Sequence, residues 1–239
     1  MTSLDDLLLA ISRGPAATAP RLTHYDGVER IELSGRVLVN WVSKAANLLV
    51  EECDAGPGTV VALDLPAGHW RAAYWALATW ACGATLDVSG AADAPDVVVS
   101  DSPGDPAGAT LVAVTTAALV RSFPGDLPGG ALDEAATLST YGDVFDAAQS
   151  ADETDVALRT DSTDGTRGAE VTFAELVPAP QSGRVLLAHP RDQAQALRTA
   201  LAVWAGGGSI VVTRTDLDDA ATEHLLATEQ ASLPADPAA

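Results

Sequence analysis

Two stretches of the chain repeat one pattern of hydrophobic and polar positions. Each begins with a short apolar run, passes a proline into a mostly apolar segment of helical length, and ends at glycine before another apolar run. A short continuous apolar run is typical of a parallel strand that is buried on both faces. The pattern predicts strands over 60–65 and 84–88 around a helix over about 68–82, and strands over 185–188 and 209–213 around a helix over about 191–205.

The two stretches also match residue by residue. Residues 61–88 align with residues 185–212 at a constant offset of 124 and without a gap, and a proline, a tryptophan and a glycine all recur. In the first copy the identical positions are Val61, Leu63, Pro66, Ala72, Ala76, Leu77, Ala78, Trp80, Ala81, Gly83 and Val88. We interpret the match as an internal duplication of a right-handed strand-helix-strand unit, with Trp80 and Trp204 packed in the core.

A weaker similarity extends upstream of both copies. The stretch from Leu22 resembles the stretch from Ala157, since each reads as a strand, an Asp-Gly pair, a second strand and the start of a helix. An Asp-Gly pair between extended residues predicts a β-hairpin. The following helix is predicted over about 40–52 in the first copy and is stopped early by Pro178 and Pro180 in the second.

The remaining segments predict a loop-rich connector and capped terminal helices. The connector has expected strands at 96–100 and 110–114, a short helix at 115–121 and a turn or helix at 141–148. Ser3 is placed to cap an N-terminal helix, and the acids at 216–219 are placed to cap the last one.

The predicted fold class is therefore α/β, with two topologically related subdomains, largely parallel sheets and a pseudo-twofold internal repeat. We expect the two copies to lie side by side in a common sheet framework. The first subdomain and connector are assigned to 1–150, the second subdomain to 151–230 and a disordered tail to 231–239.

Composition supports a packed core and narrows the classes of partner. Hydrophobic residues make up 47% of the chain, and 33 acidic against 13 basic residues give a formal charge of −20. Such a surface repels phosphate backbones and anionic lipid, so no nucleic-acid or membrane partner is expected. The apolar segment 72–86 is too short to span a bilayer and predicts a buried helix instead.

The two cysteines and the N-terminus indicate a cytoplasmic protein. Cys53 and Cys82 have no second Cys or His at metal-ligand spacing, so we expect reduced core thiols and no metal site. The N-terminus carries Asp5 and Asp6 where a secretion signal would carry Lys or Arg.

The order of these motifs resembles the N-terminal part of the adenylate-forming, AMP-binding synthetases, the superfamily of acyl-CoA synthetases, adenylation domains and luciferases. Residues 36–88 carry the resemblance: a helix, the strand beginning Gly56-Pro-Gly-Thr-Val-Val-Ala, a turn at Pro66 and the return strand after Gly83-Ala84. More narrowly, the chain is similar to a family of short actinobacterial proteins with twilight similarity to those ligases. The resemblance implies two related subdomains packed together and ATP or AMP as the candidate ligand.

The resemblance places the family's phosphate loop at RTDSTDGTRG, residues 159–168. It implies that hydroxyl and N–H groups would wrap the phosphates, with Arg167 near the place of the family's lysine. The implied binding residues are Ser162, Thr163, Gly165, Thr166, Arg167 and Gly168.

This loop departs from the family pattern. One residue and the proline are missing, and Asp161 and Asp164 add negative charge. At about 4 Å each carboxylate would oppose a phosphate by roughly 4 kcal/mol at an effective dielectric near 20. A hairpin turn explains every residue without a ligand and is the favoured alternative.

Histidines supply the other candidate site. His189 lies at the carboxyl end of a predicted parallel strand, where open α/β sheets bind ligands, and with Arg191 it would bind the anionic part of a substrate at the helix N-terminus. The alternative is a strand end on the surface. His24 and His224 are expected to face solvent, and no catalytic residue is identified, since Ser162 and Ser209 lack the glycines of a nucleophile elbow.

These observations favour a truncated, degenerate relative of AMP-forming acyl-activating ligases. The resemblance implies an adenine and metal segment, a ribose-binding Asp and a C-terminal lid with a catalytic Lys, and none of them occurs in this sequence. We expect the chain to bind a nucleotide, an acyl ligand or a partner protein without autonomous adenylation. The alternatives are half of a split enzyme that another chain completes, or a structural protein that assembles as a homo-oligomer.

Overall fold

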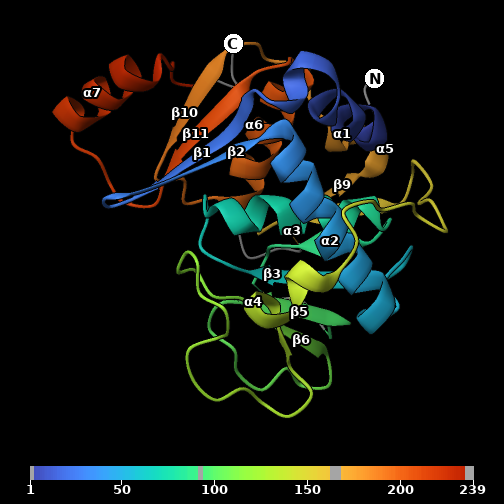
Figure 1. Cartoon of the computed structure of the whole chain (residues 1–239). Coiled ribbons are helices and arrows are strands. Elements are labelled where there is room, and N and C mark those ends of the chain that lie inside the picture. The colour runs from blue at the N-terminus through green and yellow to red at the C-terminus, as the bar shows by residue number, and fades with distance from the viewer. Residues whose placement is uncertain (1–2, 91–93, 162–167, 235–239) are drawn as a thin grey trace. The chain divides into compact units, whose positions relative to one another are not determined.

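The computed structural model describes residues 3–90, 94–161 and 168–234 (Figure 1). The chain forms two compact units, each assembled from separated segments. The first unit takes 1–39, 66–73 and 177–239, and the second takes 40–65 and 74–176. The units therefore interleave along the chain and do not divide it near residue 150.

The first unit contains a four-stranded sheet in the order β10-β11-β1-β2, whose strands lie side by side in Figure 1. The strands are β10 Arg184–Ala188, β11 Ser209–Thr213, β1 Pro20–Asp26 and β2 Glu29–Ser34. β10, β11 and β1 are parallel, and β2 returns antiparallel to β1. The turn between β1 and β2 has Gly27 at φ 58°, so the hairpin predicted from the first Asp-Gly pair is confirmed.

The second unit contains a seven-stranded sheet in the order β7-β6-β5-β3-β4-β8-β9. Its strands are β3 Val60–Asp64, β4 Thr85–Asp87, β5 Val97–Ser100, β6 Thr110–Ala113, β7 Leu132–Asp133, β8 Val156–Arg159 and β9 Glu170–Thr172. All neighbours are parallel except β8 and β9, which form an antiparallel pair. This confirms the predicted α/β class with largely parallel sheets.

The helices follow most of the predicted positions. They are α1 Leu4–Ser12, α2 Gly35–Cys53, α3 Trp70–Ala81, α4 Glu134–Thr137, α5 Phe173–Leu176, α6 Gln193–Ala205 and α7 Asp219–Glu229, with 3-10 turns η1 Gly14–Ala17 and η2 Leu138–Thr140. Ser3 Oγ accepts from the N–H of Asp6 at 3.1 Å, and Asp218 caps α7 in the same way, as predicted.

The helix predicted over 115–121 is wrong, because these residues form turns and bends. Leu119 is 98% exposed and adopts φ 59°, so an apolar helical face here would have had nothing to bury against. Most helical stability in proteins comes from packing such a face, and this segment has no packing partner for it.

The two copies of the repeat end their helices with the same hydrogen bonds. The N–H of Gly83 donates to the carbonyl of Trp80 at 3.0 Å, and the N–H of Gly207 donates to the carbonyl of Trp204 at 2.9 Å. Both glycines lie in the left-handed region, at φ 78° and 74°. The same glycine-dependent C-cap therefore ends α3 and α6.

The tryptophans of the repeat also occupy equivalent places. Trp80 Nε1 donates to the carbonyl of Ala157 in β8 at 2.8 Å, and Trp204 Nε1 donates to the carbonyl of Arg21 in β1 at 2.8 Å. Both side chains are buried. In each case the accepting strand is the one that lies beside the return strand of the repeat.

The hairpins, however, are exchanged between the copies. The hairpin β1–β2 precedes the first copy of the repeat in sequence but pairs with β11 of the second copy. The hairpin β8–β9 precedes the second copy but pairs with β4 of the first copy. The expectation of one common sheet framework is wrong, because the two copies lie in different sheets and each hairpin completes the sheet of the other copy.

Candidate functional site

The segment expected to hold phosphate joins β8 to β9. The last described ladder contact is the N–H of Thr160 donating to the carbonyl of Ala169 at 3.0 Å. Of the predicted binding residues, Ser162, Thr163, Gly165, Thr166 and Arg167 lie outside the described residues. Gly168 is described, and a Cβ at this position would lie 1.7 Å from the carbonyl oxygen of Thr160. Glycine is therefore required here by close backbone approach, which applies to a hairpin and to a ligand loop alike.

Negative charge surrounds the described ends of this segment. Arg159, the last residue of β8, forms an ion pair with Glu170 at 3.3 Å, and Asp161 is exposed. Beside Arg159 in the parallel ladder lies Asp87, the last residue of β4, which is 4% exposed. Asp87 Oδ1 accepts from the N–H and the hydroxyl of Ser89 at 2.9 and 2.6 Å.

Asp87 is a functional candidate that the sequence reasoning missed. Only the parallel register of β4 and β8 brings its carboxylate to the edge where the phosphate segment begins. The pairing of Arg159 with Glu170 leaves no surplus cationic charge among the described residues of this edge. The edge is therefore poorly suited to a polyphosphate unless a cation neutralises it.

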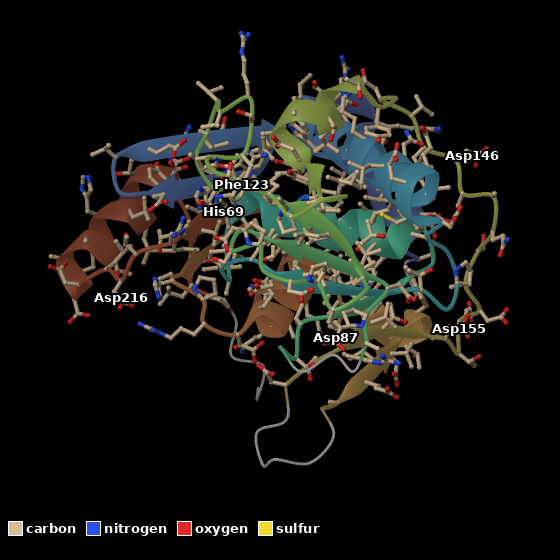
Figure 2. All side chains as sticks on the ribbon, turned by 90° about the horizontal axis from the view of Figure 1, so that it is seen from below. His69, Asp87, Phe123, Asp146, Asp155 and Asp216 are labelled. Atoms are coloured by element: carbon tan, nitrogen blue, oxygen red, sulfur yellow. The ribbon has the colours of Figure 1, made fainter. Side chains whose placement is uncertain are left out.

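The second predicted site lies at the carboxyl end of β10. His189 adopts φ 42°, its N–H donates to Thr213 Oγ1 at 3.0 Å, and its buried Nδ1 has no hydrogen-bond partner. Arg191 is directed to solvent, where it pairs with Asp216 at 2.8 Å and both side chains are about three-quarters exposed. Figure 2 shows Asp216 at the periphery, on the segment that leads to α7.

The N-terminus of α6 is occupied by the protein's own carboxylate. Asp192 Oδ1 accepts from the N–H of Gln195 at 2.9 Å. An anion bound there would have to lie beside this carboxylate and draw Arg191 from Asp216. His189 and Arg191 remain a predicted substrate site, and the geometry favours a neutral polar group over an anion.

A buried histidine pair lies in the same unit, and the expectation that His24 faces solvent is wrong. His24 is 1% exposed because this part of β1 is buried on both faces, and the residue lies between Val212 of β11 and Ile31 of β2. Its ring meets the ring of His69 edge to face, with centroids 4.9 Å apart. Leu22 and Thr23, on opposite faces of the strand, are also at most 1% exposed, so the burial of His24 follows from the position of β1 inside the sheet and not from an alternating pattern.

His24 is held in its neutral form. Burial lowers its pKa to about 4, with a smaller opposing effect of Asp26 and a further lowering by Arg214. Arg214 and Asp26 pair with each other at 3.1 Å at the carboxyl ends of β11 and β1. Neither ring nitrogen of His24 has a hydrogen-bond partner.

A cavity of about 20 Å³ adjoins this pair and has room for one water molecule. Its polar lining comes from His69 and from Gln193, whose buried Oε1 also lacks a hydrogen-bond partner. Gly68 closes the wall, since a Cβ there would lie 2.8 Å from Val212. This edge can therefore offer neutral hydrogen-bonding groups in an apolar setting.

The fold is that of the N-terminal part of the AMP-forming synthetases, as the sequence resemblance implied. An acyl-CoA synthetase of Brucella canis superposes with a TM-score of 0.74 at 13% identity, over 96% of this chain and 46% of that one. A fatty acyl-CoA synthetase of Mycobacterium tuberculosis gives 0.66 at 16% identity, over 97% of this chain and 48% of that one. The N-terminal domain of FACL13 from the same organism gives 0.67 at 16% identity, over 97% and 62%.

Sequence comparison adds one curated relative. The TIGR03089 family protein of Mycobacterium tuberculosis is 40% identical over 104 residues, which make up 43% of this chain and 36% of that protein. No family model matches the chain. The chain thus spans about a third of this relative and about half of the full synthetases.

Three further properties concern the described residues alone. None of their helices combines the length and apolar character that crossing a bilayer requires. Among them, no three His, Cys, Asp or Glu side chains lie close enough together to hold a metal ion. Cys53 and Cys82 are both free thiols.

Proposed function

We propose that this chain is a degenerate relative of the acyl-activating ligases that binds an acyl or nucleotide ligand without forming an adenylate by itself. The match of 96% of the chain to the fold of an acyl-CoA synthetase supports an acyl group or a nucleotide as the class of ligand. The buried carboxylate of Asp87, beside the segment that would receive the phosphates, is the observation that carries the loss of adenylation.

The negative charges at this edge predict which ligands bind weakly. ATP would bring its triphosphate to an edge that already holds Asp87 and Asp161. An acyl-adenylate or AMP carries fewer phosphate charges, so its electrostatic penalty at this edge is smaller. We therefore expect the chain to bind an acyl-adenylate analogue and AMP more tightly than ATP.

Isothermal titration calorimetry with ATP, AMP and a non-hydrolysable acyl-adenylate analogue, each with and without Mg²⁺, tests this proposal. The analogue should bind most tightly, and Mg²⁺ should improve ATP more than AMP. The variant Asp87→Asn should strengthen ATP binding about tenfold, equivalent to about 1.4 kcal/mol. The matched change Asp126→Asn, at an exposed loop position of the same unit, should leave it unaltered. Tighter binding of metal-free ATP than of AMP would refute the electrostatic reasoning, and no heat with any ligand would refute ligand binding.

A second candidate is one half of an adenylate-forming enzyme that another chain completes. It is favoured by the match of nearly the whole chain to about half of the full synthetases. In that case pyrophosphate release from ATP and a fatty acid should be absent with this chain alone and appear when cell extract is added. Release by the purified chain alone would contradict both candidates.

A further inference from the structure

A cavity of about 250 Å³ lies within the second unit, and Asp87 and Arg159 are not among its lining residues. It is bounded by the C-terminal end of α2, by the turn that follows it, by Phe145 and by residues 147–149. Cys82 forms part of the buried side, where its Sγ lies 3.6 Å from the carbonyl of Ala46. Since an engineered cavity of about 150 Å³ holds benzene, this one has room for an aromatic ring with a short side chain.

The outer wall is anchored to α2 by the only lysine in the sequence. Lys44 Nζ donates to the carbonyls of Tyr141 and Ser139 at 2.5 and 3.2 Å and pairs with Asp143 at 2.8 Å. Its side chain is 17% exposed. The segment that enters the cavity wall therefore begins from a fixed point.

Two more side chains of α2 hold the same segment. Asn47 Nδ2 donates to the carbonyls of Gly142 and Val144 at 3.1 and 3.0 Å. The hydroxyl of Tyr141 donates to Glu52 at 2.9 Å. Phe145, which follows Val144 in the sequence, lines the cavity. The loop is irregular in secondary structure but is built onto the helix, so the cavity has a defined wall.

The opposite wall is the negative end of a 19-residue helix. The last carbonyls of α2 carry the negative pole of the helix dipole, and the last turn contains no basic residue. Asp54 follows at φ 50° and lines the cavity, and the turn is closed by the N–H of Gly56 donating to Thr59 Oγ1 at 3.0 Å. A carboxylate and a helix C-terminus on one side favour a cation.

The cysteine at this end of α2 is kept in its thiol form. The pKa of Cys53 is raised to about 11, mainly by burial and secondarily by the carboxylates of Glu52 and Asp54. Phe145 adds an aromatic face, which attracts organic cations as well as apolar groups.

We propose that this cavity binds a small primary organic amine, with its ammonium group at Asp54 and the C-terminus of α2 and its apolar part against Phe145. The lining of this site shares no residue with the sites described above, and the proposal does not rest on the proposed function. The volume of the cavity suits an amine of about the size of benzylamine.

Calorimetric titration of the full chain with benzylamine at low ionic strength tests the proposal, and benzyl alcohol serves as the neutral analogue of the same shape. Benzylamine should bind one to one with a millimolar dissociation constant, and benzyl alcohol at least tenfold more weakly. Asp54→Asn should weaken benzylamine about tenfold, and asparagine suits this position because it tolerates the left-handed backbone conformation. Phe145→Ala should weaken both compounds.

The control variant is Asp146→Asn, which removes the same charge from a residue that is exposed and does not line the cavity. Figure 2 shows Asp146 at the edge of the molecule on the loop that follows Phe145. This variant should bind benzylamine within about twofold of the parent chain. Equal losses in the Asp54 and Asp146 variants would mean general attraction to an acidic protein and would overturn the site. Equal binding of benzylamine and benzyl alcohol would refute recognition of the ammonium group. Near-ultraviolet circular dichroism that matches the parent chain would show that the variants are folded.

Discussion

The neutral state of His24 predicts a specific loss of stability in mild acid. In the unfolded chain its pKa returns to about 6.5, whereas in the fold burial lowers it to about 4. Between these values the unfolded chain binds a proton that the folded chain does not, so the free energy of unfolding falls as the pH falls. At about 1.4 kcal/mol per pKa unit, the loss across this window is at most about 3 kcal/mol.

The measurement compares urea unfolding of the parent chain and of His24→Leu at pH values from about 7.5 to about 4. Leucine cannot titrate, and the carboxylates common to both chains cancel in the difference. At neutral pH the variant should be at least as stable, because burying ring nitrogens without partners costs about 1–3 kcal/mol. As the pH falls, the variant should gain up to about 3 kcal/mol over the parent.

The matched control is His224→Gln, since His224 is exposed on α7. This variant should keep the pH dependence of the parent chain. A constant difference between the parent chain and His24→Leu across the whole pH range would show that His24 is not held neutral, and the burial argument would fail.

Three further tests concern the packing of the repeat and of the last helix. Trp80→Phe and Trp204→Phe each remove an indole donor from a buried carbonyl, so each should lower the free energy of unfolding by about 1–3 kcal/mol in urea titrations. Very different losses of stability in the two variants would contradict the equivalence of the two tryptophan positions. Gly208→Ala should lower the free energy of unfolding by more than about 2 kcal/mol in the same assay, because its Cβ would lie 2.1 Å from a backbone oxygen. In the control Gly56→Ala the new Cβ would meet nothing within 4 Å, so the stability should hardly change. Burial opposes ionisation of Glu229, but hydrogen bonds from Tyr25, Arg30 and Arg184 lower its pKa to about 2. Glu229→Gln should therefore loosen α7, and limited proteolysis should detect faster cleavage in this helix. An unchanged cleavage rate would mean that other contacts hold α7 in place.

The strand-helix-strand units could be predicted because they repeat. Strands β4, β10 and β11 are largely buried, β3 buries alternate residues, and both helices are followed by a glycine in the left-handed region, so both copies show the same hydrophobic and glycine signals. Strand β11 was predicted at its observed bounds. The short helix at 115–121 failed because local composition does not show whether an apolar segment finds a surface to cover.

The candidate site could be predicted only in part. His189 lies at the strand end where the pattern placed it, but the burial of His24 depends on the position of β1 between β11 and β2 in a sheet that is covered on both faces there. Asp87 lies 72 residues before Arg159 in the sequence, and only strand pairing makes them neighbours. Contacts of this kind depend on register, which the order of motifs does not determine.

The exchange of hairpins between the copies has a consequence for how the protein is made. Strand β1 is synthesised well before its parallel neighbour β11, which leaves the ribosome only after nearly two hundred further residues. Pairings of such long sequence separation form slowly, so the edge of the hairpin β1–β2 stays open until β11 has been synthesised. Cutting the gene between the copies would give two fragments that each lack a strand partner, whereas co-expression of both fragments would restore the missing pairs.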